Sequence, residues 1–135
     1  MAEKKNGIIL EYDSDKILLT KYFIFNGKME GEYKSYHVNG QLQIIYNYKN
    51  NKKEGEYKKY YKNRQLSISC HYKNNNLEGK CKLYWGNREL QAICNYKNNK
   101  LNGEYKEYDK DGKLWKLYNY KNDLYNKEYK EYSKI

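Results

Sequence analysis

Apolar and polar residues alternate along most of the chain, in short stretches separated by clusters of Asn, Gly and Lys. In one such stretch, Leu42, Ile44, Tyr46 and Tyr48 occupy every second position. This period of two is typical of a β-strand with one half-buried face. The stretch follows an Asn-Gly pair at residues 39–40, which favours a two-residue type I′ turn because both central residues of that turn need positive φ. The pattern therefore predicts antiparallel β-hairpins closed by two-residue turns.

The hairpin pattern repeats every 24 residues without insertion. Its first place is usually Gly, its sixth is Tyr and its twelfth is Leu. We expect these places and the turn glycine to hold the structure together; they include Gly31, Gly40, Gly55, Gly79, Gly103, Tyr36, Tyr60, Tyr84, Tyr108, Leu42, Leu66, Leu90 and Leu114. After a leader of residues 1–6, the copies span residues 7–30, 31–54, 55–78, 79–102 and 103–126, and a half copy spans 127–135. We predict one all-β domain, an elongated single-layer antiparallel meander of about 11 strands in which each copy contacts only its neighbours.

A two-residue turn would also fix the register of each hairpin. Counting outward from residues 39–40 places Tyr33 opposite Tyr46. Alternation then puts Leu42 on the face of these two tyrosines, and puts Tyr36 on the other, wetter face. The polar stretch that begins Tyr-Lys-Asn-Asn in most copies is expected to form a loop of about five residues before the next glycine.

The unit Gly-x-Tyr-x-x-Tyr-x-x-Asn-Gly-x-Leu, followed by a strand that ends Tyr-Lys-Asn-Asn-Lys-x-x-Gly, resembles the MORN repeat over residues 7–135. It is similar to the longer variant found in bacterial antitoxin-like proteins and in giant-virus proteins. Lys16, Arg64 and Arg88 stand where this repeat usually has its turn glycine. The resemblance implies a scaffold, a binder of anionic lipid, or an antitoxin-like neutraliser of a partner protein, and the fold does not choose among them.

Tyrosine and lysine dominate the composition. The 19 tyrosines can supply a core, because each ring buries apolar area while its hydroxyl stays near water. The net charge is +10, and copies two to four carry +9 of it. Lys49, Lys73, Lys97 and Lys121 share one place in the repeat, so they should form a row along one edge that attracts phosphates of lipid or nucleic acid. The alternative is a solvated edge that prevents pairing with other sheets, with an AT-rich genome as the source of the lysines.

The first copy is unusually apolar on the wetter face, where later copies have polar residues. The residues concerned are Leu19, Phe23 and Phe25, with Ile8, Leu10 and Ile17 beside them. Trp115 and Leu117 are predicted to form a smaller spot of the same kind on the fifth copy. Such an end either caps the array or docks a protein partner.

The sequence contains no pattern typical of a catalytic or metal site. His37 and His71 occupy different places in the repeat, and no nucleophile–base pair interrupts it. Alternation places His71 on the face opposite Cys70, so these two residues, Cys81 and Cys94 are not expected to converge on a metal. We therefore expect neither an enzyme nor a cofactor.

The three cysteines are expected to replace tyrosine as small core residues. The register predicts that Cys81 faces Cys94 as a close pair of free thiols and that Cys70 faces Tyr57. The first residues lack the apolar stretch that a signal peptide contains, and no apolar run is long enough to span a membrane. We expect a cytoplasmic protein, or one of the virion or host cytoplasm if it is viral.

Together these features favour a non-enzymatic scaffold that binds another protein or has a structural role, with no small-molecule substrate. The alternative is an electrostatic binder of anionic membrane lipid or nucleic acid through copies two to four. Salt should distinguish the two, because electrostatic binding to phosphates weakens steeply as salt rises.

Overall fold

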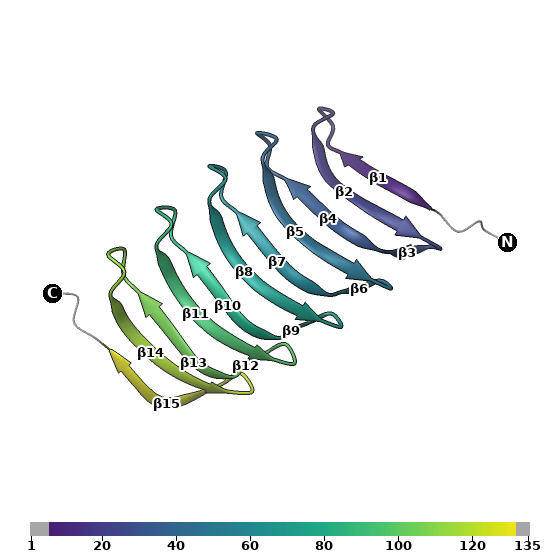
Figure 1. Cartoon of the computed structure of the whole chain (residues 1–135). Coiled ribbons are helices and arrows are strands. Elements are labelled where there is room, and N and C mark those ends of the chain that lie inside the picture. Colours follow the sequence, from purple (N-terminus) through teal and green to yellow (C-terminus); the bar gives the residue numbers. More distant parts are fainter. Residues whose placement is uncertain (1–5, 132–135) are drawn as a thin grey trace.

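A computed structural model describes the backbone of residues 6–131 and the side chains of residues 6–124. This part of the chain forms one open antiparallel sheet without a helix, and Figure 1 shows a single curved layer of consecutive hairpins. The long strands follow one another in space as in the chain: β1 (Gly7–Tyr12), β2 (Leu18–Phe25), β4 (Gly31–Tyr36), β5 (Leu42–Lys49), β7 (Gly55–Tyr60), β8 (Leu66–Lys73), β10 (Gly79–Tyr84), β11 (Leu90–Lys97), β13 (Gly103–Tyr108), β14 (Leu114–Lys121) and β15 (Leu124–Glu131). The predicted single-layer meander is confirmed.

The Tyr-Lys-Asn-Asn stretch is a second tight hairpin turn, so the prediction of a five-residue loop there is wrong. Asn50 and Asn51 have positive φ, 49° and 69°, as a type I′ turn requires. Lys49 pairs with Lys52 directly across this turn. Asn suits both central places because it tolerates the left-handed region better than most residues. A two-residue strand follows each of four such turns: β3 (Lys28–Met29), β6 (Lys52–Lys53), β9 (Asn76–Leu77) and β12 (Lys100–Leu101).

The hairpin tip at residues 38–40 is a three-residue loop rather than the predicted two-residue turn. The His37 N–H donates to the Gln41 carbonyl at 2.8 Å, and the Gly40 N–H donates to the His37 carbonyl at 2.9 Å. Only Gly40 has positive φ in this loop, 86°, whereas a type I′ turn would need it at both central residues. The tip is therefore a type I turn closed by one left-handed residue. The equivalent residues in the other hairpins also have positive φ: Lys16, Arg64, Arg88 and Gly112.

A β-bulge beside the tip restores the predicted register further along the hairpin. Ser35 pairs with Ile44 as predicted, whereas Tyr36 pairs with Leu42, which leaves Gln43 as an extra residue. Leu42 therefore lies on the face of Tyr36, and Gln43 turns to the other face, where its Oε1 accepts a hydrogen bond from Ser35 Oγ at 3.4 Å. The predicted placement of the twelfth-place leucines is wrong for this reason. The same shift occurs in the other four hairpins.

Side chains from the third and sixteenth places form a column across the sheet, one from each strand. Tyr33 pairs with Tyr46 as predicted. The rings of Tyr22, Tyr33, Tyr46 and Tyr57 stack in that order, with centroid distances of 5.5, 4.9 and 5.7 Å. A strand spacing of ~4.8 Å brings neighbouring rings into stacking range. We call the face that carries this column the tyrosine face.

Cysteines continue the column where copies three and four meet. Cys81 pairs with Cys94, and Cys70 pairs with Tyr57, as predicted. However, Cys81 also lies beside Cys70 of the preceding copy, with Cα atoms 4.3 Å apart, and the two form a disulfide, while Cys94 is a buried free thiol. The prediction of two free thiols was wrong because it considered the partner within the hairpin and not the neighbour across the copy boundary. These cysteines and Ala92 are the buried hydrophobic residues of the described chain.

Hydrogen bonds at the Asn turns join each copy to the next. The Asn75 N–H donates to the Lys53 carbonyl at 2.9 Å, and Asn75 Oδ1 accepts the Lys53 N–H at 2.8 Å. The preceding glutamate contributes as well, because Glu54 Oε2 accepts the Asn74 N–H at 2.8 Å. The same contacts recur at neighbouring turns. These bonds hold the turns in line, and so set the spacing of every side chain along that edge of the sheet.

Candidate functional site

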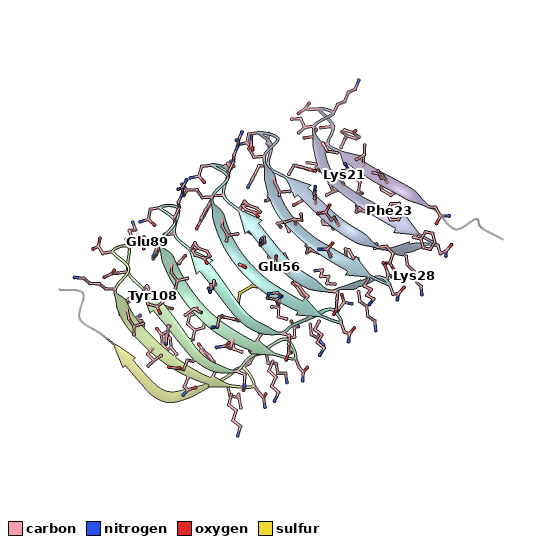
Figure 2. The ribbon with its side chains drawn as sticks, in the orientation of Figure 1. Lys21, Phe23, Lys28, Glu56, Glu89 and Tyr108 are labelled. Atoms are coloured by element: carbon pink, nitrogen blue, oxygen red, sulfur yellow. A yellow bond between two sulfur atoms is a disulfide. The ribbon has the colours of Figure 1, made fainter. Side chains whose placement is uncertain are left out.

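Exposed apolar side chains gather on the first hairpin. Of the eight exposed large hydrophobic residues in the described chain, six belong to β1 and β2. Ile8 (62% exposed) pairs with Phe23 (38%), and alternation places Leu10 and Phe25 on the same face, opposite the tyrosine face. We call these four residues the apolar end patch; Figure 2 labels Phe23 within it.

Charged side chains of both signs border the apolar end patch. A shallow hollow of about 270 Å³ lies over the first copy boundary and is lined by Ile8, Lys21, Tyr22, Phe23, Glu32 and Lys34. Lys21 pairs with Lys34 across this boundary. An apolar centre with a charged rim is the usual anatomy of a protein-binding surface.

Two of the residues predicted to lie in exposed apolar spots are moved to the tyrosine face by the bulges. Leu19 is the extra residue of the first bulge, so it turns to the tyrosine face, away from Phe23. Trp115 is the extra residue of the fifth bulge and lines a hollow with Leu83 and Tyr105. Leu117 pairs with Lys106 on the opposite face. Trp115 and Leu117 therefore do not form the single spot that the sequence predicted.

The predicted lysine row lies at the edge formed by the Asn turns. Lys49, Lys73, Lys97 and Lys121 are all exposed at the ends of their strands. In copies two and four the row is doubled, because Lys52 and Lys100 pair with Lys49 and Lys97 across the turn. Figure 2 shows side chains projecting along this edge, beyond the labelled Lys28 of the first turn.

The acidic residues nearest to this row do not form ion pairs with it. Glu30, Glu54 and Glu78 each accept the backbone N–H of the following Asn turn, at 2.7 to 2.8 Å. Among described residues, the ion pairs are Lys34–Glu32 at 3.8 Å and Lys58–Glu56 at 3.3 Å, which lie away from the turns. The ammonium groups of the row therefore face solvent.

The titratable groups of the tyrosine face are poor acids and bases at neutral pH. Burial raises the pKa of Cys94 to about 11 and, as the main cause, raises the pKa of Tyr105 to about 12. Burial also raises the pKa of Tyr46, assisted by its hydroxyl contact with Tyr48 at 3.3 Å. A thiol held protonated in this way is a weak nucleophile.

Neither histidine lies in an arrangement typical of catalysis. His37 Nε2 is 2.8 Å from the Tyr60 carbonyl of the next hairpin, so it joins two tips. His71 is exposed and pairs with Glu56. No group of His, Cys, Asp and Glu in the described chain has the geometry of a metal site. The described residues also form no helix that is long and apolar enough to cross a membrane.

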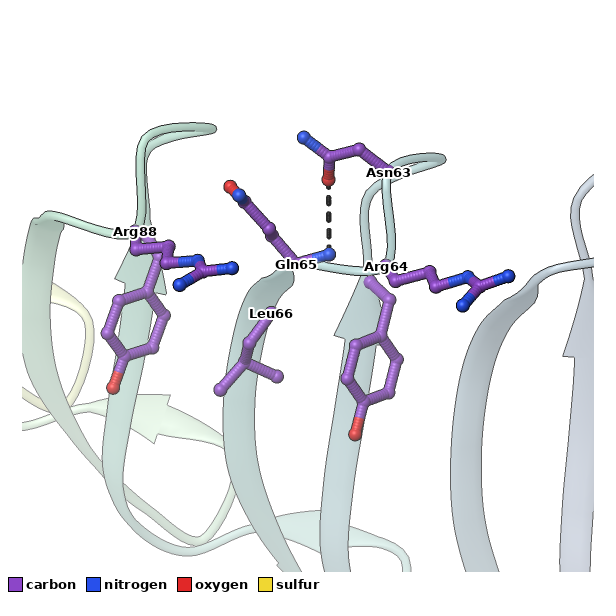
Figure 3. Close-up of a pocket in the computed structure, with 7 residues that line it drawn as sticks. Asn63, Arg64, Gln65, Leu66 and Arg88 are labelled. Carbon is purple, nitrogen blue, oxygen red and sulfur yellow. Dashed lines mark hydrogen bonds between the residues drawn. The ribbon is translucent and has the colours of Figure 1, made fainter.

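Sequence reasoning missed a hollow between the third and fourth hairpin tips, shown in Figure 3. It measures about 610 Å³ and is lined by Tyr60, Asn63, Arg64, Gln65, Leu66, Tyr84 and Arg88. One signal was available: the only two arginines of the chain occupy the same place in consecutive copies.

Comparison with protein families identifies the repeat. The model of the MORN repeat variant matches residues 29–50, 53–74 and 101–122. Each matched segment begins at a two-residue strand and ends at the next Asn turn, and the starts differ by one or two 24-residue periods. The first and fourth copies have no match, and the fourth holds Cys81 and Cys94, where other copies mostly have tyrosine. The search of curated proteins found no match to the chain. The repeat match and the hairpin array agree with one another, and the chain is a MORN-repeat protein.

Proposed function

We propose that this chain is a non-enzymatic scaffold that binds a protein partner through the apolar end patch. The observation that carries the proposal is the exposure of Ile8, Leu10, Phe23 and Phe25 on one face of a terminal hairpin. Terminal copies of repeat arrays normally present a polar outer surface, which keeps the array soluble. Single exposed apolar residues are common on proteins, whereas a contiguous group on a terminal copy indicates a binding surface.

The position of the patch also supports a protein partner. Among the described strands, β1 lies at the edge of the sheet and pairs with β2 alone, so its other edge can accept a further strand. A partner strand added there would extend the apolar surface of Ile8 and Leu10, in the mode known as β-augmentation. The charged rim of Lys21, Glu32 and Lys34 would orient that partner.

The test is capture of partners from the native source by wild-type protein and by matched variants. Phe23→Ser combined with Phe25→Ser should abolish capture, because two aromatic anchors are lost. Val38→Ser removes a more exposed apolar residue (71%) at a hairpin tip outside the patch, and should leave capture intact. Capture should persist between ~50 and ~500 mM salt, since apolar contacts are not screened. A partner retained by the double Phe variant would contradict the proposal.

A second candidate function is electrostatic binding of anionic membrane lipid or nucleic acid. It is favoured by the exposed lysine row, whose nearest carboxylates accept hydrogen bonds from turn backbones. Each Lys near an anionic surface contributes ~1 kcal/mol. Binding of phosphatidylserine vesicles or duplex DNA should therefore be measurable at ~50 mM salt and should collapse by ~200 mM.

Charge-matched variants separate this second function from general attraction to a basic protein. Changing Lys49, Lys73 and Lys97 together to Glu should abolish vesicle and DNA binding. Changing Lys62, Lys110 and Lys113 to Glu makes the same change in net charge at the opposite edge, where all three are exposed. Equal losses in both triple variants, or no binding by the wild type at low salt, would exclude a role for the row.

A further inference from the structure

We propose that the hollow between the third and fourth hairpin tips binds an aryl phosphate, a phosphoryl group carried on an aromatic ring. The hollow lies at the tip edge, well separated from the apolar end patch, so this inference is independent of the proposed function. It is large enough for a small ligand, since binding pockets typically measure ~300–1,000 Å³.

The rim of the hollow carries an arginine at each of its two hairpin tips. Arg64 and Arg88 occupy the tip position that requires positive φ, with values of 75° and 76°. Gly40 and Gly112 fill the same position in neighbouring copies, and glycine adopts this conformation without strain. Two consecutive tips therefore keep an arginine where the backbone favours glycine. Backbone strain retained in this way is typical of functional positions.

The two guanidinium groups form few contacts with other side chains of the described chain. With the Gln65 amide nitrogen donating to the Gly86 carbonyl, the amide oxygen accepts from Arg88 Nε at 3.2 Å. This contact uses one of the five N–H donors of Arg88 and leaves its outer fork for a ligand. No described carboxylate forms an ion pair with Arg64 or Arg88. The adjacent Glu89 carboxylate is directed to the fifth hairpin, 3.4 Å from where a Cβ on Gly112 would lie.

The hollow is lined by aromatic and aliphatic side chains below the two tips. Tyr60, Leu66 and Tyr84 line it together, because the bulge places the twelfth-place leucine on the face of the sixth-place tyrosines. In Figure 3, Leu66 lies below the tips and the Arg88 guanidinium extends toward it, while the exposed Arg64 guanidinium points outward on the other side. The third and fourth hairpins form the two sides of the hollow, and a hydrogen bond joins them, since the Tyr61 hydroxyl donates to the Tyr84 carbonyl.

These features select the ligand chemistry. The Arg88 guanidinium, which extends over the hollow, can bind phosphate oxygens in bidentate fashion. Arg64 lines the hollow, but its guanidinium points away, so it adds positive charge at the rim rather than a second direct contact. The tyrosine rings and Leu66 offer an aromatic and aliphatic floor for the ring that carries the phosphoryl group. The Asn63 amide lies at the mouth, where its Oδ1 accepts the Gln65 N–H at 3.1 Å and its nitrogen remains a donor.

The test is titration of the full chain with phenyl phosphate, followed by NMR shifts of the tip amides. Arg88→Gly should weaken binding by roughly tenfold or more, as expected for loss of a charge-assisted bidentate contact. This variant restores the residue found at Gly40 and Gly112, so the fold is retained. Arg88→Lys keeps the charge without the planar fork and should also weaken binding. Lys16→Gly is the matched control, because it removes a positive charge from the same tip position, at φ 66°, outside the hollow.

Further ligands identify the source of the phosphoryl group. A phosphotyrosine peptide that binds at least about tenfold more tightly than phenyl phosphate indicates a phosphorylated protein, and equal affinity indicates a free phosphate ester. The proposal is overturned if the tip amides show no shifts at about 5 mM phenyl phosphate, because the dissociation constant would then be higher than a specific site of this size should have. It is also overturned if Lys16→Gly weakens binding as much as Arg88→Gly, or if inorganic phosphate binds as tightly as phenyl phosphate.

Discussion

Replacing Asn75 by Ala should lower the free energy of unfolding by about 2 kcal/mol, although the side chain is exposed and polar. Two effects add. Asn75 Oδ1 accepts the Lys53 N–H at 2.8 Å, and a protein hydrogen bond contributes about 1 kcal/mol net. Asn75 also has φ of 72°, and a residue with an ordinary Cβ costs about 1 kcal/mol more than Asn in this region. The loss falls on the contact between the second and third copies, in the middle of the array.

Two further substitutions at this position separate the two effects. Asn75→Gly keeps the left-handed conformation and removes only the acceptor, so we expect a loss of about 1 kcal/mol. Asn75→Asp keeps both, as the chain itself demonstrates two copy boundaries later. There Asp123 has φ of 67°, and its Oδ1 accepts the Leu101 N–H at 2.6 Å. Asn75→Asp should therefore cost less than about 0.5 kcal/mol.

Urea denaturation followed by circular dichroism measures these differences. Amide hydrogen exchange adds a local readout, because loss of the acceptor should speed exchange of the Lys53 N–H in the Ala and Gly variants alone. The reasoning is refuted if Asn75→Asp destabilises as much as Asn75→Ala. It is refuted equally if Asn75→Gly leaves both stability and Lys53 exchange unchanged, since the side-chain contact between copies would then contribute nothing.

Three further predictions concern a tip, ionisation and the thiols. Gly40→Val should cost about 2 kcal/mol and Arg64→Val clearly less in urea denaturation, because residue 64 already carries a Cβ at positive φ, and equal losses would contradict this reasoning. Burial raises the pKa of Tyr105 to about 12 and that of Cys94 to about 11. The stability linked to these protonated groups is therefore complete below their unfolded pKa values of about 10 and 9 and is lost as pH rises through the folded values. Circular dichroism should show the β-sheet signal becoming easier to abolish with urea as pH rises from about 9 to about 12, and unchanged stability over this range would contradict the reasoning. Without reductant, a thiol reagent should modify one thiol per unfolded chain and none after Cys94→Ser, whereas a second reactive thiol would show that Cys70 is not bonded to its neighbour.

The repeat and most of its register could be read from the sequence because the pattern is periodic. A Gly every 24 residues, with tyrosines in phase, fixed the copy boundaries. Counting outward from residues 39–40 correctly paired Tyr33 with Tyr46, and counting outward from residues 87–88 correctly paired Cys81 with Cys94. Alternation also located the lysine row and the apolar character of the first copy, since both depend only on strand positions far from the tips.

The tips could not be read in the same way because two irregularities compensate for each other. The loop takes Val38 from the first strand, which shifts the pairing by one residue, and the bulge adds Gln43 on the second strand, so the pairs from Ser35 outward return to the expected register. The error therefore affected only the residues between the tip and the bulge. Leu19 and Trp115 are two of these, and both were predicted on the wrong face. The hollow at Leu66 was missed for the same reason, since it depends on the leucine lying beside the sixth-place tyrosines.

A repeat array offers an internal reference against which each departure from the pattern can be weighed. Cys81 and Cys94 replace tyrosines at buried places of the column and keep its pairing, so packing accounts for them. The arginines at the tips are different, because the neighbouring copies show that glycine serves the backbone better there. The apolar end patch is different in the same sense, since the other copies carry polar residues at the four equivalent positions. Departures that the fold explains are neutral substitutions within the repeat, and departures that the fold would disfavour are where binding should be sought.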